Sequence, residues 1–157
     1  MLELRALATG VVTCAASPPA VDAVLSASAD GAEAFRIAPD EAMLLTPSPG
    51  DTNALVASAH ERATGVDPDA VVLDASDGWT AWALEGDSFR GAFARLSALE
   101  LTGAGLVQGE VTGVPVRVVA QPERLVLLVP AMWSEHVRSR ILSRCADLHV
   151  REAEGTR

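Results

Sequence analysis

The feature that most constrains the fold of this chain is an internal repeat. An extended run, a Pro-acidic turn, a second apolar run and a closing proline occupy residues 35–47, and the same order occupies residues 118–130. Matched positions, such as Pro39 and Pro122, lie 83 residues apart. Proline followed by an acidic residue favours a tight turn, so each copy predicts a β-hairpin. The chain is therefore expected to contain two related halves.

A helical pattern follows each closing proline. In the first copy the apolar positions of residues 55–63 fall on one helical face. In the second copy the apolar positions recur every four residues, at Trp133, Val137, Ile141 and Cys145. Short apolar runs at 71–73 and 148–150 then predict a closing strand in each half.

Another strand and helix precede each hairpin. Residues 79–84 predict a strand, and Asp87 or Ser88 can cap the helix that follows. That helix has an apolar stripe, formed by Phe89, Ala92, Phe93, Leu96 and Leu99. In the first half, residues 2–13 and 21–27 are the equivalent strand and helix. Each half therefore has the order βαββαβ, the split ferredoxin-like pattern.

The predicted fold class is α+β, with two tandem ferredoxin-like half-domains, residues 1–76 and 77–157, that together form one compact unit. In an alternating strand Trp79 and Trp82 lie on opposite faces, and residues 125–129 are apolar without a break. Both sheet faces should therefore be covered. Helices can cover one face, and the other must meet the second half-domain or a separate protein, since leaving it in water would be costly.

Composition excludes several classes of function. The 157 residues contain 12 basic and 21 acidic side chains, and a net charge of −9 disfavours nucleic acid as a partner. Cys14 and Cys145 have neither disulfide nor zinc-ligand spacing, which fits a reduced, cytoplasmic location. The apolar stretch 6–16 is interrupted by polar residues, so it predicts a buried strand rather than a signal peptide. No stretch reaches the length of a membrane span.

Motifs of catalytic and metal sites are absent from the sequence. His60, His136 and His149 stand apart from one another, so no metal site is predicted. Gly103 and Gly109 bracket a glycine-containing segment that is interpreted as a flexible loop between a helix and a strand. The sequence shows no nucleophile elbow, Walker loop or dinucleotide-binding glycine pattern.

The segment 71–79 holds the one candidate site, and two interpretations stay open. Asp74 ends a predicted buried strand, so it could be partly desolvated and act as an anchor or base for a small polar ligand. Alternatively, Asp74, Ser76 and Asp77 hydrogen-bond to the backbone in an Asx-type turn. The candidate catalytic residue is Asp74, and the candidate folate-binding residues are Asp74, Ser76 and Trp79.

The order of motifs along residues 35–143 resembles the gamma subunit of heterotetrameric sarcosine oxidase. The resemblance is carried by short motifs in a shared order, Ala38-Pro39-Asp40-Glu41, Leu73-Asp74-Ala75-Ser76-Asp77, Leu84-Glu85-Gly86, Ala94-Arg95-Leu96-Ser97-Ala98-Leu99-Glu100-Leu101, Thr112-Gly113-Val114-Pro115-Val116 and Leu127-Leu128-Val129-Pro130. The chain departs from the family at residues 97–101, where the family has Cys-Pro-Leu-Asp-Leu, and at Asp87, where the family has proline.

The resemblance implies the fold of the glycine cleavage T-protein, a folate-binding aminomethyltransferase, with the halves packed together as in its N-terminal part. It implies an accessory subunit that binds no cofactor by itself, while flavin and folate chemistry belong to a larger partner subunit. Two alternatives stay open: a tetrahydrofolate-dependent one-carbon transferase that uses Asp74, and a homodimeric binding or scaffold domain.

Overall fold

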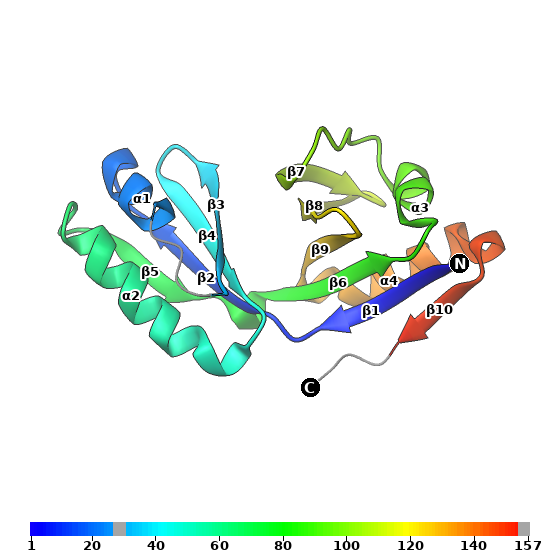
Figure 1. Ribbon diagram of the computed structural model, residues 1–157, viewed down its shortest axis with the longest axis horizontal. Coiled ribbons are helices and arrows are strands. Elements are labelled where there is room, and N and C mark those ends of the chain that lie inside the picture. The colour runs from blue at the N-terminus through cyan, green and yellow to red at the C-terminus, as the bar shows by residue number, and fades with distance from the viewer. Residues whose placement is uncertain (27–30, 154–157) are drawn as a thin grey trace. The chain divides into compact units, whose positions relative to one another are not determined.

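The computed structural model describes residues 1–26 and 31–153. Within them the chain forms two β-sheets and four α-helices, which confirms the predicted α+β class (Figure 1). The chain divides into two units by its contacts: one comprises residues 8–76, and the other comprises residues 1–7 and 77–157. Along the chain the units meet at residues 76 and 77, and the first seven residues belong with the C-terminal part.

The unit of residues 8–76 is a four-stranded antiparallel sheet with two α-helices. The strands follow the spatial order β3-β4-β2-β5. Its elements are β2 (Gly10–Ala15), α1 (Pro18–Leu25), β3 (Glu33–Ala38), β4 (Glu41–Thr46), the 3-10 turn η1 (Pro49–Asp51), α2 (Thr52–Thr64) and β5 (Val71–Asp74). The helices connect strands that are not adjacent, which is the split βαβ arrangement predicted for the first half.

One hydrophobic core binds the two helices to one face of this sheet. Alternate residues of the strands contribute to it, Val12 and Cys14 from β2 among them, because successive side chains point to opposite faces. The predicted apolar face of α2 is confirmed, with Leu55, Ala59 and Ala63 buried. Helix α1 starts earlier than expected because prolines suit the first helical turn; the expected end at Ala27 lies outside the described residues.

The other unit contains a six-stranded sheet in the order β10-β1-β6-β9-β8-β7. Its elements are β1 (Leu2–Leu7), the 3-10 turn η2 (Ser76–Gly78) at the boundary, β6 (Trp79–Glu85), α3 (Phe89–Leu96), β7 (Gly105–Val111), β8 (Val114–Ala120), β9 (Arg124–Pro130), η3 (Ala131–Trp133), α4 (Ser134–Arg144), η4 (Ala146–Leu148) and β10 (Val150–Ala153). Helices α3 and α4 share its core with alternate strand residues, including Trp82 and Leu84. The run 125–129 is buried throughout, as its unbroken apolar character predicted.

Strand β1 is the main difference from the predicted topology. Residues 2–13 were expected to form one strand, but β1 and β2 lie in different sheets. Leu2 and Leu4 belong to one core, whereas Val12 and Cys14 belong to the other. Each strand therefore has its own alternation of buried residues, and the two patterns are separated at residues 8–9. Strand β1 lies between β10, which it pairs in parallel, and β6, which it pairs antiparallel. It therefore adds a strand within the sheet of the C-terminal part.

Both predicted hairpins are present, as the pairs β3/β4 and β8/β9. The relation between the two halves as a repeat remains a prediction. Most of the glycine-containing segment, however, is strand rather than flexible loop: Gly105 and Gly109 lie in β7, which pairs with all of β8, and Gly103 lies in the connection before it. A Cβ atom on Gly109 would lie 2.4 Å from Cδ2 of Leu99, so only glycine leaves room for this leucine to pack against the strand.

The C-terminal elements differ in detail from their predicted bounds. Val137, Ile141 and Cys145 are buried as expected, but Trp133 lies in η3 and is 44% exposed, because the α-helix begins only at Ser134. The last strand begins at Val150 rather than Leu148, since His149 adopts a left-handed backbone conformation that ends η4.

Candidate functional site

The segment after β5 forms the Asx-type turn that was one of the two interpretations. The backbone N–H of Ser76 donates to Oδ1 of Asp74 at 2.9 Å. The Ser76 hydroxyl is held in turn by the start of β2, because the N–H of Val11 donates to its Oγ at 2.9 Å. Ala75 N–H also donates to the carbonyl of Val11, at 2.8 Å. The side chains of Asp74 and Ser76 thus fasten the end of β5 to β2.

The electrostatic environment of Asp74 differs from the expected desolvated carboxylate. Asp74 is exposed, and so are Val71 and Leu73 of the same strand, so the strand that Asp74 ends is not buried. Hydrogen bonds from Ser76 lower the pKa of Asp74 below its ordinary value. A carboxylate with a lowered pKa is a weaker proton acceptor, so this environment favours a structural role over that of a general base.

Trp79 lies in the other unit, at the start of β6. The guanidinium carbon of Arg117 stands 4.7 Å from the centre of its indole ring, within the range of a cation–π contact. Asp74 and Ser76 belong to the unit of residues 8–76, whereas Trp79 belongs to the unit of residues 1–7 and 77–157. Their joint role in binding folate therefore stays a prediction.

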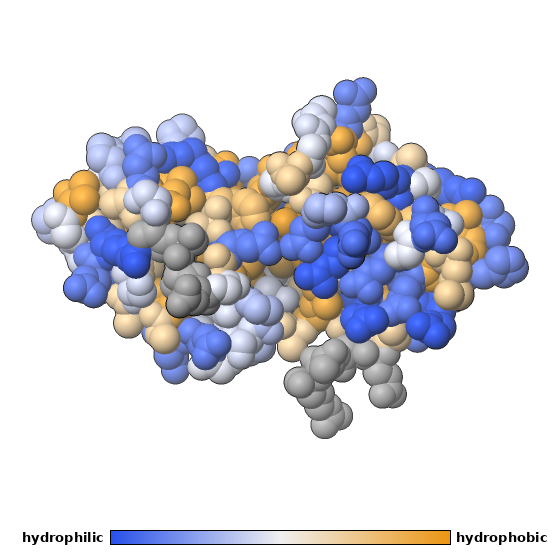
Figure 2. Space-filling view, in the orientation of Figure 1, coloured by the Kyte–Doolittle hydropathy of each residue, from blue (hydrophilic) through white to orange (hydrophobic). Residues whose placement is uncertain are grey.

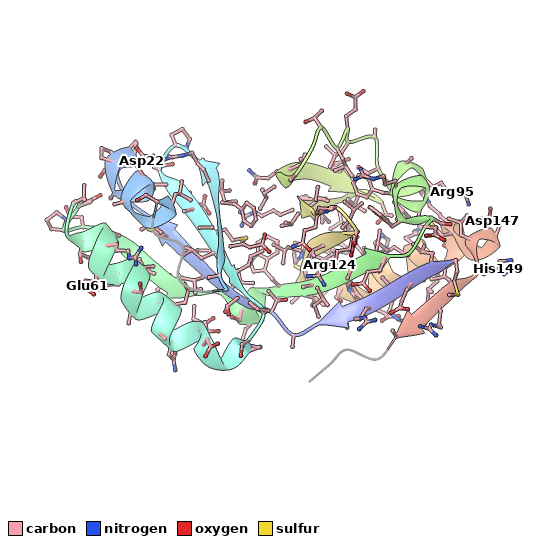
Figure 3. The ribbon with its side chains drawn as sticks, in the orientation of Figure 1. Asp22, Glu61, Arg95, Arg124, Asp147 and His149 are labelled. Carbon is pink, nitrogen blue, oxygen red and sulfur yellow. The ribbon has the colours of Figure 1, made fainter. Side chains whose placement is uncertain are left out.

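A pocket of about 890 Å³ lies within the six-stranded unit, where β6 leads into α3 and β8 turns into β9. Its lining is formed by Glu85, Gly86, Asp87, Phe89, Gln121, Pro122, Glu123 and Arg124. Arg124, labelled in Figure 3, donates from Nε to the side-chain oxygen of Gln121 at 2.6 Å. A smaller pocket of about 450 Å³ lies between the end of α3 and the β7–β8 turn. Neither pocket is lined by Asp74, Ser76 or Trp79.

A chain of ion pairs crosses four neighbouring strands beside the larger pocket. Arg151 of β10 contacts Glu3 of β1 at 2.6 Å, and Glu3 also pairs with Arg5. Glu85 of β6 then lies 3.6 Å from Arg5 and 3.5 Å from Arg124 of β9. Hydrogen bonds from Arg151 and Arg5 lower the pKa of Glu3, and the bond from Arg151 has the larger effect. Local sequence patterns do not indicate this group, because its members become neighbours only when β1 enters the sheet.

The three histidines belong to different elements of the chain. His60 is exposed on α2, and His149 is exposed after η4. The rings of His136 and Trp133 pack in a T-shaped arrangement, with 5.8 Å between their centroids. Among the described residues, no three His, Cys, Asp or Glu side chains are grouped to hold a metal ion. Figure 3 shows His149 near the Arg95–Asp147 ion pair that joins α3 to η4.

The drawn face of the molecule carries many hydrophilic residues, particularly over the six-stranded unit (Figure 2). No helix in the described ranges is long and apolar enough to cross a membrane.

The fold is similar to that of several solved structures. No protein-family model matches the chain, and no curated protein matches it in sequence. Among solved structures it is similar to a chain of the heterotetrameric sarcosine oxidase from Corynebacterium sp. U-96, with a TM-score of 0.78 and 18% identity over 97% of this chain and 87% of that one. These values show a shared fold.

Two further structures share this architecture to different extents. The glycine cleavage system aminomethyltransferase T from Bartonella henselae gives a TM-score of 0.72 at 12% identity; the match covers 97% of this chain and 47% of that one. The regulatory subunit of aspartate kinase from Thermus thermophilus gives 0.50 at 10% identity, over 91% of this chain and 95% of that one. The chain thus spans about half of the aminomethyltransferase but most of the sarcosine oxidase chain.

Proposed function

We propose that this protein is a non-catalytic accessory subunit of a flavin- and folate-dependent amine oxidase or demethylase, similar to the gamma subunit of sarcosine oxidase. The observation that carries the proposal is the match in length as well as fold, since 97% of this chain aligns with 87% of a chain from a heterotetrameric oxidase. A chain that corresponds to almost a whole subunit is suited to act as a subunit itself.

The candidate site supports this role over independent catalysis. Asp74 is exposed, its Oδ1 accepts the Ser76 N–H, and its lowered pKa disfavours proton abstraction at neutral pH. Neither pocket described above includes Asp74. In the proposed complex the larger subunits hold the flavin and folate and carry out the chemistry.

The cellular setting of the complex is part of the proposal. Both cysteines are free and buried, which fits a reduced, cytoplasmic environment. The partner is a larger flavoprotein, and the acidic surface of this chain favours a partner with a complementary basic surface.

Reconstitution tests the proposed role. The larger subunits of the oxidase would be prepared without this chain, and peroxide formation from sarcosine and other N-methyl amines would be measured before and after its addition. We expect the isolated chain to be inactive and its addition to raise the amount of stable, active complex. Activity of the isolated chain, or larger subunits that neither bind nor respond to it, would refute the proposal.

A second candidate function is a folate-dependent one-carbon transferase, which the likeness to aminomethyltransferase T favours. Its discriminating test is a titration with folinic acid, followed by tryptophan fluorescence and corrected for ligand absorption. Saturable quenching that disappears in Asp74→Ala but persists in Asp77→Ala would support this candidate. The accessory-subunit role predicts a flat titration.

A further inference from the structure

We infer that the outer edge of β5 is a docking surface for β5 of a second copy of this chain, paired antiparallel about Val72. This inference does not depend on the proposed function. Strand β5 ends the order β3-β4-β2-β5, so β2 is its neighbour on one side, and no other strand in the described part of the chain pairs with it (Figure 1). An edge strand presents backbone donors and acceptors to any strand that can match them.

The side chains of β5 do not protect this edge. Val71 and Leu73 lie on one face of the strand and are 50% and 57% exposed. Natural edge strands usually carry lysine, proline or a bulge that blocks pairing. The sequence Val-Val-Leu-Asp has no lysine or proline, and its register with β2 is regular. The edge is therefore apolar and open to pairing, with Asp74 as its only charge.

The hydrogen bonds to β2 show which backbone groups face outward. Ala75 N–H donates to the carbonyl of Val11, so these residues form a hydrogen-bonded pair of the antiparallel ladder. Such pairs alternate with non-hydrogen-bonded pairs along a strand. Val71 and Leu73 therefore direct their backbone groups to β2, and Val72 and Asp74 direct theirs to the outer edge.

A two-fold axis at Val72 would pair the backbone donors of each copy with acceptors of the other, and would also bring their exposed apolar side chains together. The outward groups of Val72 meet those of Val72 in the second copy and exchange two hydrogen bonds. The N–H of Asp74 then faces the carbonyl of Ala70 in the second copy. The N–H of Ala70 needs no partner there, because it already donates to the carbonyl of Asp67 in its own chain. Val71 lies opposite Leu73 of the second copy on the same sheet face, so the exposed apolar side chains cover one another.

Repulsion between the two Asp74 carboxylates favours the register centred on Val72 over the one centred on Leu73. Centring the axis on Leu73 would also match outward groups, but it would place the two Asp74 residues about 7 Å apart along the strands at ~3.4 Å per residue. Centring it on Val72 doubles that separation to about 14 Å. Because each copy also carries a net charge of −9, added salt should strengthen the dimer.

Disulfide trapping tests the register directly. Val71→Cys and Leu73→Cys chains, mixed under mild oxidation, should give a cross-linked heterodimer of the two variants, because directly opposed residues are within disulfide range. Either variant alone should cross-link several times less, since identical positions lie diagonally, beyond about 7 Å. Val66→Cys, at an equally exposed valine outside β5, gives the background. Equal yields in the mixed, single-variant and Val66→Cys samples would overturn the inference.

Sedimentation of the full chain over a range of concentrations gives an independent measurement. The wild-type protein should shift from monomer towards dimer, and Val72→Pro should weaken dimerisation about tenfold, since it removes the outward N–H from both copies. Far-UV circular dichroism checks that this variant folds; if it does not, the cross-linking result decides. A protein that stays monomeric, or a dimer whose affinity Val72→Pro leaves unchanged, would contradict the inference, as would another protein found paired with β5.

Discussion

Arg151 donates from Nη2 to Oε2 of Glu3 at 2.6 Å, across a sequence separation of 148 residues. The contact joins β10 to β1 and places the N-terminal strand inside the C-terminal sheet. Glu3 is also bound by Arg5, and together the arginines lower its pKa below the ordinary value of 4.5. The first strand is thus held by charge as well as by its buried leucines.

We predict that Glu3 contributes to the pH dependence of stability. Its folded-state pKa is lowered, so its contribution is fully present above the unfolded-state value of about 4.5 and decreases as the pH falls towards the folded-state pKa. Glu3→Gln should lower the melting temperature at pH 7 and flatten its decrease below about pH 4.5. Thermal unfolding at several pH values measures this; a variant whose profile matches that of Glu135→Gln, an exposed helix control, would contradict the prediction.

Gly86 should be among the glycines least tolerant of substitution. Its φ is +90°, and an added Cβ would lie 2.6 Å from the carbonyl oxygen of Met1. Gly113 also has a positive φ, of +81°, but has open space around it. We expect Gly113→Ala to cost about 1–2 kcal/mol of unfolding free energy, and Gly86→Ala about 3–4 kcal/mol because it adds a backbone clash. Equal costs in urea denaturation would show that the contact with Met1 is unimportant.

The β7–β8 turn offers a stabilising substitution. Thr112 and Gly113 both have positive φ, of 54° and 81°, as a two-residue type I′ turn requires. Asparagine tolerates this conformation better than a β-branched residue, and the hydroxyl of Thr112 is buried without a hydrogen-bond partner in the described residues. Thr112→Asn should therefore raise the unfolding free energy by about 0.5–1 kcal/mol. A loss of stability would contradict the prediction and would mean that the Thr112 hydroxyl stabilises the turn.

The turn after β5 should depend mainly on an acceptor at position 74, with a smaller contribution from the charge that its lowered pKa indicates. Asp74→Asn keeps an oxygen for the Ser76 N–H, whereas Asp74→Ala removes it. We expect Asp74→Asn to unfold close to wild type, and Asp74→Ala to lose about 0.5–1.5 kcal/mol, as for one hydrogen bond. Urea denaturation of both variants distinguishes these outcomes, and equal losses would indicate that the carboxylate charge matters instead.

Local sequence signals predicted most of the elements. Proline before an acidic residue located both hairpins, and the four-residue steps through Val137, Ile141 and Cys145 identified the buried face of α4. Strand β7 was missed because a glycine such as Gly109 has low strand propensity, and its advantage, room for Leu99, exists only in the folded core.

Long-range relations were beyond the local patterns. Periodicity shows that residues 2–7 form a strand, but it cannot show which sheet that strand enters. The ion pairs between Arg151, Glu3 and Glu85 follow from that choice of sheet. At the candidate site the sequence indicated the Asx turn, but the exposure of Asp74 depends on β5 being at the sheet edge, which local sequence does not determine.

The most direct test of the accessory-subunit role is to isolate the tagged protein from its own cells and record the visible absorption spectrum of what co-purifies. We predict a stoichiometric complex with a larger protein that shows a flavin spectrum and is bleached by its amine substrate. An unrelated tagged protein of similar size and charge provides the control. A colourless isolate with no stoichiometric partner, obtained while the oxidase subunits are present in the same cells, would contradict the proposed function.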